Sequence, residues 1–231
     1  MALNNGEKFP IPENVLAAVN YARDRNIRVV FMTCGIAGSG KSTLARNLEK
    51  EFGYVRLSVD KYIFEKYGVW KIGMSYNKPP KYQIRLQQTR ATHWARLTLT
   101  PLGFPEVQYE KQQEEAHHWI KAELTGLLRE GKKDIVLDLS LWAKIERQMW
   151  RDIVNHEGQG RYTEQLVVFK NSITYFQKRI HRRNKLWEST DNKEAEKVEG
   201  RPVSFDMFLL YCKQFQWPKF GDEGEITVGI S

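Results

Sequence analysis

The chain has 231 residues, of which 41% are apolar and 28% charged, a composition that suits one compact domain and excludes a disordered or fibrous protein. Lys and Arg outnumber Asp and Glu by 36 to 28, a net charge of +8, and no apolar run approaches the roughly 18 residues of a membrane span. Because the N-terminus has no secretory signal pattern and two cysteines, Cys34 and Cys212, cannot form a disulfide scaffold, we expect a cytoplasmic protein without membrane contact.

The first part of the chain predicts a helix, a strand and a second helix in succession. Apolar residues at near-helical spacing predict a helix over 13–25, and the β-branched run over 27–34 is typical of a buried parallel strand. A glycine-rich segment follows, and the helical run over 41–52 then ends at a glycine. Residues 54–58 predict a short second strand.

Strands and helices continue to alternate through the second half of the chain. The predicted strands are short apolar runs at 134–140, 165–170 and 225–230. The predicted helices carry apolar stripes and fall at 111–130, 142–154, 173–187 and 204–215. This alternation predicts an α/β fold with a mainly parallel sheet flanked by helices.

The clearest motif is GIAGSGKS over residues 35–42, which fits the phosphate-loop pattern G-x-x-x-x-G-K-[ST]. Its glycines let successive backbone N–H groups point at an anion, and the next helix presents its positive dipole end to the same phosphates. Lys41 would supply a full charge to the β- and γ-phosphates. The nucleotide-binding candidates are Gly35, Ala37, Gly38, Ser39, Gly40, Lys41, Ser42 and Thr43.

A magnesium ion would be held by Ser42 and by an acid at the end of a neighbouring strand. Asp138 closes the strand DIVLD, and ligands of open α/β sheets bind beyond the carboxyl ends of the strands. Asp134 begins that strand and would lie at the wrong end. The alternative for Asp138 is a capping or solvated aspartate. The expected cofactors are therefore ATP and Mg²⁺.

Two blocks, GIAGSGKSTLARNLEKEFGYVRLSVDKY and DIVLDLSLWAKIERQMWRDIV, resemble the zeta-toxin-like and polynucleotide-kinase-like P-loop kinases, a group of small ATP-binding kinases. The segments KRIHRRNK and FQWPKFGDEGE resemble later blocks of the same group. The resemblance implies one domain over 1–231, a three-layer P-loop NTPase-type sandwich with helical acceptor and lid insertions. In such kinases the poorly matching residues 61–130 would hold the acceptor, and residues 173–202 would form the lid.

The resemblance also implies roles for single residues. Asp60 matches the aspartate that accepts the acceptor's proton, and a carboxylate beyond the second strand could lie near the γ-phosphate; the alternative is a helix N-cap. A basic cluster formed by Lys178 and three arginines matches the lid of these kinases. There Arg179, Arg182 and Arg183 would neutralise charge on the transferred phosphoryl group; the alternative is a solvated helix face. Arg147 matches an arginine that could hold a carboxylate.

The acceptor is the open question. Residues 61–100 contain eight basic residues, one acid and seven aromatics, which fits either a basic helical surface or a surface for an anionic or aromatic ligand. We expect an ATP-dependent phosphotransferase acting on a hydroxyl of a small molecule. The alternatives are a polynucleotide 5′-hydroxyl kinase and a nucleotide-binding regulatory ATPase without an acceptor. The guanine-reading pattern N-K-x-D is absent, since Leu186 and Trp187 follow Asn184-Lys185, which favours ATP.

Overall fold

A computed structural model describes residues 10–68, 82–89, 94–101, 106–189, 205–219 and 225–229, together with Val203 and Gly221. For residues 82–89 and 94–101 and for a few others, among them 106, 107, 183 and 186–189, it describes the backbone alone. The first expected element, the helix over 13–25, is present as α1 (Glu13–Asp24). Within the described part of the chain, no helix combines the length and the apolar character that a membrane crossing requires.

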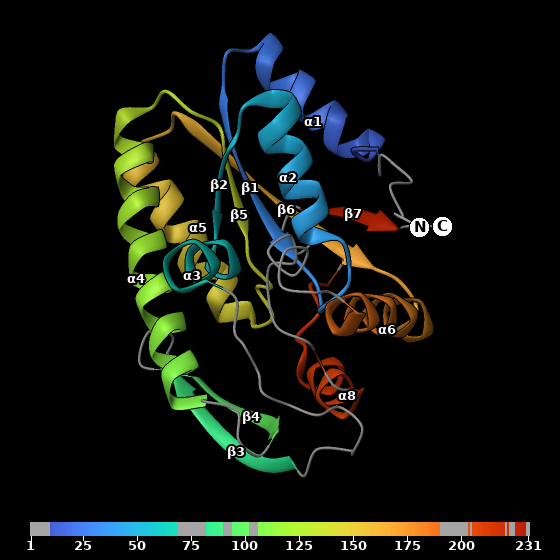
Figure 1. Ribbon diagram of the computed structural model, residues 1–231. Coiled ribbons are helices and arrows are strands. Elements are labelled where there is room, and N and C mark those ends of the chain that lie inside the picture. Colours follow the sequence, from blue (N-terminus) through green and yellow to red (C-terminus); the bar gives the residue numbers. More distant parts are fainter. Residues whose placement is uncertain are drawn as a thin grey trace.

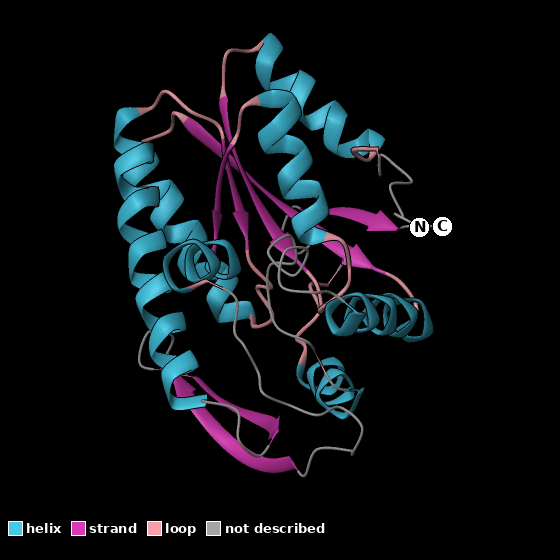
Figure 2. Ribbon diagram, in the orientation of Figure 1, coloured by secondary structure: helices cyan, strands magenta, loops and turns pink. Residues whose placement is uncertain are grey.

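The core of the fold is a five-stranded sheet in the order β2-β5-β1-β6-β7. Every pairing in it is parallel, so the carboxyl ends of all five strands lie on the same side of the sheet (Figure 2). We call this side the carboxyl edge and the opposite side, where the strands begin, the amino edge. The strands are β1 (Arg28–Cys34), β2 (Val55–Ser58), β5 (Ile135–Asp138), β6 (Tyr162–Lys170) and β7 (Glu225–Gly229). This confirms the α/β fold with a parallel sheet that the sequence predicts.

Helices cover both faces of the sheet (Figure 1). Alternate residues of β1 point to opposite faces, so Val29 and Phe31 pack with α1 and α2 (Lys41–Phe52), whereas Val30 and Met32 pack with the other layer. That other layer is built from α4 (Glu106–Glu130) and α5 (Lys144–Gly158). Two apolar cores, one on each face, therefore hold the sheet as the middle layer of three.

The amino edge of the sheet is held by an aspartate. A carboxylate oxygen of Asp134 accepts a hydrogen bond of 2.8 Å from the backbone N–H of Val29. Its other oxygen lies 3.3 Å from a guanidinium nitrogen of Arg28, which forms a partly exposed ion pair. Asp134 therefore lies at the opposite end of β5 from Asp138, as expected from its place in the sequence.

The segment between β2 and β5 contains two helices and a hairpin. The helices are α3 (Val59–Tyr67) and α4, which contains the helix expected over 111–130. Between them, β3 (Tyr82–Thr89) and β4 (Trp94–Pro101) form an antiparallel hairpin that the sequence reading did not predict. Its register sets Ile84 opposite Leu99 and Leu86 opposite Leu97, since apolar and polar residues alternate with the period of a strand. Figure 1 shows the hairpin at the end of α4 that is remote from the sheet's amino edge.

Two further helices, α6 (Ile173–Ser189) and α8 (Phe205–Gln214), lie near the carboxyl edge (Figure 1). Phe176 and Ile180 of α6 pack into the same core as Phe208 of α8. The side-chain amide of Asn184 donates a hydrogen bond of 2.7 Å to the carbonyl oxygen of Val203 and accepts one from the N–H of Val203 at 3.3 Å. These contacts connect the end of α6 with the chain that leads into α8. Residues 190–202 of the expected lid lie outside the described residues.

Candidate functional site

The glycine-rich segment forms the turn between β1 and α2 at the carboxyl edge of the sheet. Gly38 and Gly40 have φ values of 78° and 107°, in the left-handed region that other residues rarely adopt. Gly35 is needed for a different reason, since a Cβ there would lie 3.1 Å from the Cβ of Phe169 on β6. Gly40 is the N-cap of α2, so the first turn of that helix opens at the loop. The loop therefore has the backbone geometry of an anion-binding nest.

The lysine of the motif lies over this loop. Its Nζ donates hydrogen bonds to the carbonyl oxygen of Ile36 at 2.8 Å and to Oγ of Ser39 at 3.4 Å. The charge of Lys41 is therefore placed at the mouth of the loop. The structure brings all eight nucleotide-binding candidates together here: Gly35, Ala37, Gly38, Ser39, Gly40, Lys41, Ser42 and Thr43.

Ser42 and Asp138 meet at the same place, as the magnesium hypothesis requires. The hydroxyl of Ser42 donates a hydrogen bond of 3.0 Å to Oδ1 of Asp138. Both are hard oxygen donors of the kind that Mg²⁺ prefers. The side chain of Asp138 is 2% exposed, so the solvated alternative does not hold. Among the described residues, no group of three or more His, Cys, Asp or Glu side chains could hold a metal ion.

Sequence reasoning missed the second partner of Asp138. Arg56 on β2 donates hydrogen bonds to Oδ2 from Nε at 3.0 Å and from Nη2 at 2.6 Å. Its side chain is 1% exposed, which makes this a buried ion pair. The only signal for it in the sequence is an arginine inside the short apolar run of the second strand.

Asp60 lies in the first turn of α3, exposed to solvent. Ser58, and not Asp60, is the N-cap of this helix, because Oγ of Ser58 accepts a hydrogen bond from the N–H of Lys61 at 3.3 Å. The N-cap alternative for Asp60 is therefore excluded. In the sheet register Ser58 is opposite Asp138, so Asp60 follows β2 directly beyond the edge at which Asp138 ends β5.

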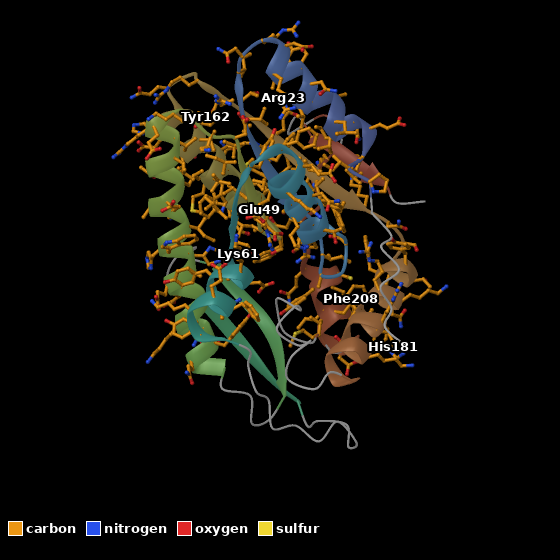
Figure 3. All side chains as sticks on the ribbon, turned by 45° about the horizontal axis from the view of Figure 1, so that its top comes forward. Arg23, Glu49, Lys61, Tyr162, His181 and Phe208 are labelled. Carbon is orange, nitrogen blue, oxygen red and sulfur yellow. The ribbon has the colours of Figure 1, made fainter. Side chains whose placement is uncertain are left out.

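The exposed surface of α3 is tied to its neighbours by ion pairs. Lys61 contacts Glu49 of α2 at 2.8 Å, and Figure 3 shows these two residues near the middle of the molecule. On the other side Glu115 of α4 accepts hydrogen bonds from Lys66, Tyr62 and Tyr67, which we call the Glu115 cluster. These three donors, Lys66 first, lower the pKa of Glu115 to about 2.

The Glu115 cluster also shifts the pKa values of the groups that donate to Glu115. The hydrogen bond to Glu115 raises the pKa of Lys66 and that of Tyr67 above their ordinary values. The ring of Tyr62 stacks on Trp119 with a centroid distance of 5.0 Å. Lys66 is therefore held cationic but already paired with an anion.

The arginines expected to form a lid belong to α6, which packs directly on the phosphate loop. A Cβ at Gly38 would lie 2.9 Å from Cγ1 of Ile180, which shows how close the helix comes. Arg179 donates a hydrogen bond of 3.0 Å to the hydroxyl of Tyr175 on the same helix, and Arg182 is exposed. The side chain of Arg183 lies outside the described part of the chain.

The loop that follows β5 is fastened to the phosphate loop. The N–H of Gly35 donates a hydrogen bond of 3.0 Å to the carbonyl oxygen of Ser140. Arg147 of α5 donates one of 2.9 Å to the carbonyl oxygen of Leu141. The acceptor of this bond is a backbone carbonyl, and Arg147 has further interactions besides it, so the expected contact with a carboxylate stays a prediction.

The chain after α8 returns to this same loop. Gln216 caps α5, since its side chain accepts a hydrogen bond from the N–H of Lys144 at 3.0 Å. Its own N–H donates to the carbonyl oxygen of Trp142, also at 3.0 Å. Sequence reasoning did not single out this contact, for which a lone glutamine in a loop gives no signal.

The comparisons with known proteins agree with this architecture. A family model described as an AAA domain matches residues 30–199. No curated protein matches the chain. Among solved structures, a candidate kinase from Chloroflexus aurantiacus superposes with a TM-score of 0.55 at 13% identity, over 88% of this chain and 85% of that one.

Two further solved structures match with TM-scores below 0.5. A gluconokinase from Sinorhizobium meliloti 1021 has a TM-score of 0.46 at 12% identity, over 89% of this chain and 84% of its own. A fungal RNA kinase has a TM-score of 0.45 at 11% identity, over 88% and 75%. At these identities the likeness to the Chloroflexus protein shows a shared fold alone.

Proposed function

The chain belongs to the AAA domain family, and from that premise we propose that it is an ATP-dependent phosphotransferase acting on a small-molecule hydroxyl. The observation that carries the proposal is the position of Asp60. An exposed carboxylate lies two residues after the end of β2, on the side of the sheet where Ser42 and Asp138 meet beside the phosphate loop. A kinase needs a proton acceptor on that side, whereas a nucleotide switch does not.

The phosphate loop would hold the nucleotide. Backbone N–H groups of the loop and the first turn of α2 suit the β- and γ-phosphates, and Lys41 adds a full charge. ATP is favoured over GTP because the guanine-reading pattern N-K-x-D is incomplete here. In addition, the side chain of Asn184, with which the partial match begins, is hydrogen-bonded to the backbone of Val203. That amide is therefore already occupied within the fold.

Magnesium fits the oxygen donors at this site. Ser42 would bind the ion through its hydroxyl, and Asp138 would assist, partly through water. When bound, the ion supplies positive charge that offsets the charge on the phosphoryl oxygens.

The transfer step itself needs few groups. Asp60 would take the proton of the acceptor hydroxyl as its oxygen bonds to the γ-phosphorus and the bond to the β-phosphate oxygen breaks, which releases ADP. Arg179, Arg182 and Arg183 on α6 would stabilise the charge of the transferred group. Catalysis of this kind consists mainly of positioning and charge stabilisation.

The ion pairs of α3 favour a small acceptor over a polynucleotide. Binding to a nucleic acid backbone requires cations that can pair with phosphates. Lys61 and Lys66 are instead paired with Glu49 and Glu115, so two of the eight basic residues in 61–100 are neutralised by acids from other helices. The other six have side chains outside the described residues.

A transfer screen tests the proposal. Purified protein is incubated with γ-³²P-ATP and Mg²⁺ and with nucleosides, sugars, alcohols or 5′-hydroxyl oligonucleotides. We expect label on a small acceptor, and we expect Asp60→Asn to lower the transfer rate by about 10³-fold or more with ADP affinity nearly unchanged. Asp206→Asn is the matched control, because Asp206 is also an exposed acid in the first turn of a helix.

Each other outcome selects a different function. Label on oligonucleotides alone would establish the polynucleotide kinase. Nucleotide binding without transfer to any acceptor would leave the regulatory ATPase. Transfer that survives in Asp60→Asn would show that another group accepts the proton.

A further inference from the structure

The two oxygens of the Asp138 carboxylate are engaged by two different partners. Ser42 of the phosphate loop donates to Oδ1 at 3.0 Å. Arg56 donates twice to Oδ2, at 3.0 and 2.6 Å. The acid expected to assist magnesium is thus already paired with a permanent cation on the protein.

The strand order places Arg56 there. β2 is the edge strand next to β5, and its register sets Arg56 opposite Val136 and Ser58 opposite Asp138. The side chain of Arg56 therefore starts at a sheet position two residues before Asp138 and extends along the strands toward the carboxyl edge. Val136 belongs to the apolar core beneath α1 and α2, so the guanidinium lies on the face that α2 covers.

Stability alone does not account for a buried ion pair at this position. Removing an arginine and an aspartate from water costs free energy that their attraction only partly returns, and apolar residues of similar volume often serve as well. Next to a phosphate site, however, the guanidinium has an electrostatic consequence. It offsets the negative charge of Asp138, which would otherwise repel the phosphates of a nucleotide bound at the loop.

We infer that Arg56 is a positioning residue that holds Asp138 toward Ser42 and reduces the dependence of nucleotide binding on magnesium. The inference rests on the nucleotide site of the proposed function but not on the transfer reaction. With Arg56 in place, the phosphates meet an aspartate whose charge is already offset before any metal arrives. Without it, the carboxylate repels the phosphates and attracts a divalent cation more strongly.

Displacement of a fluorescent ADP analogue by ADP, in EDTA and in excess Mg²⁺, tests this. The ratio of the two dissociation constants gives the coupling between metal and nucleotide. In Arg56→Gln we expect this ratio to rise about tenfold, chiefly because metal-free affinity falls. Arg56→Lys keeps the charge, so its ratio should stay near the wild-type value. Electron paramagnetic resonance of Mn²⁺ without nucleotide should show tighter metal binding in Arg56→Gln.

Arg28→Gln is the matched control. Arg28 also pairs with an aspartate between neighbouring strands, but at the amino edge of the sheet. Its loss should leave the coupling ratio unchanged. A purely structural role for Arg56 would instead weaken ADP binding equally with and without Mg²⁺, and that result would overturn the inference.

Asp138→Asn supplies a test that does not depend on the folding of Arg56→Gln. It removes the negative charge of Asp138 beside the guanidinium, so metal-free ADP affinity should rise severalfold while Mn²⁺ affinity falls. Unchanged or weaker metal-free binding would overturn the inference. If wild-type protein binds no ADP in either buffer, the proposed function falls together with it. If ADP binds but no acceptor is ever phosphorylated, only the proposed reaction falls.

Discussion

The Nη1 atom of Arg147 donates a hydrogen bond of 2.9 Å to the carbonyl oxygen of Leu141, a buried residue whose φ of 44° lies in the left-handed region. A leucine in that conformation costs of order 1 kcal/mol or more and persists only where its surroundings hold it. The thiol of Cys34 contacts the same oxygen at 3.5 Å. The carbonyl oxygen of Ser140, one residue earlier, accepts a hydrogen bond from the N–H of Gly35 in the phosphate loop. Arg147 of α5 therefore supports the phosphate loop through Leu141.

Replacement of this arginine by lysine should therefore destabilise the protein. Arg147→Lys keeps the charge but loses the planar donor fork, and we expect the free energy of unfolding to fall by about 1–3 kcal/mol. Urea denaturation measures the change. Arg129→Lys is the control, since Arg129 is exposed and should change stability by less than about 0.5 kcal/mol. Equal effects of the two substitutions would contradict a supporting role for Arg147.

The elements of the sheet and the phosphate loop could be predicted because their signals are local. A β-branched run predicts β1, the helical run after the glycines predicts α2, and Gly35–Ser42 match their pattern within eight successive positions. Local order also sufficed to separate Asp138 from Asp134, since the direction of a parallel strand decides which end faces a ligand.

Pairings between distant residues could not be predicted. Arg56 meets Asp138 across 82 positions of sequence, and Lys66 meets Glu115 across 49. Such partners depend on which strands are neighbours and how helices cross, and neither leaves a periodic pattern. The N-cap at Ser58 was missed for a smaller reason, because Ser58 and Asp60 are both good caps two residues apart.

The Glu115 cluster gives a prediction about polyanions. Glu115→Gln removes the carboxylate that neutralises Lys66, so a salt-sensitive affinity for single-stranded oligonucleotides should appear or increase. One additional phosphate contact should steepen the log–log salt dependence by about 0.7. Fluorescence anisotropy of a labelled oligonucleotide between low and moderate salt measures this slope.

Glu157→Gln separates this local effect from net charge. Glu157 is paired with Arg129 on the α4–α5 side of the molecule, and its loss changes the net charge by the same amount. If both variants gain equal affinity, the increase reflects total charge and Lys66 has no special part in it.

The partly buried His117 on α4 gives a prediction about pH. Desolvation of the imidazole, followed by the nearby charges of Lys121 and His118, lowers the pKa of His117 from 6.5 to about 4. Between these values the unfolded chain binds more protons than the folded one, so stability should rise with pH from about 4 to 6.5 and then level off. Urea midpoints at several pH values measure this slope.

His117→Gln should reduce that slope, because the replacement cannot take up a proton. His118→Gln is the matched control, since His118 is the adjacent residue but is exposed. A slope that survives unchanged in His117→Gln would assign the pH dependence to other groups.

The packing of α6 on the phosphate loop gives the last prediction. Gly38→Ala adds a Cβ in the left-handed region, 2.9 Å from Cγ1 of Ile180, which is buried. Gly53→Ala creates the same backbone strain at a φ of 73°, where no described atom outside the adjacent chain lies within 4 Å of the new Cβ. We expect a loss of about 1 kcal/mol in Gly53→Ala and of about 2–4 kcal/mol in Gly38→Ala.

The difference between the losses in unfolding free energy of Gly38→Ala and Gly53→Ala measures how rigidly α6 packs on the phosphate loop. Adding Ile180→Ala to Gly38→Ala removes the opposing atoms, so the double variant should be more stable than the sum of the two single changes implies. Equal losses in the two glycine variants would mean that α6 yields to the added methyl group. In that case the helix that carries Arg179 and Arg182 can shift relative to the phosphate loop at little cost. A large difference means instead that this helix is packed rigidly on the loop, as the proposed role of the two arginines requires.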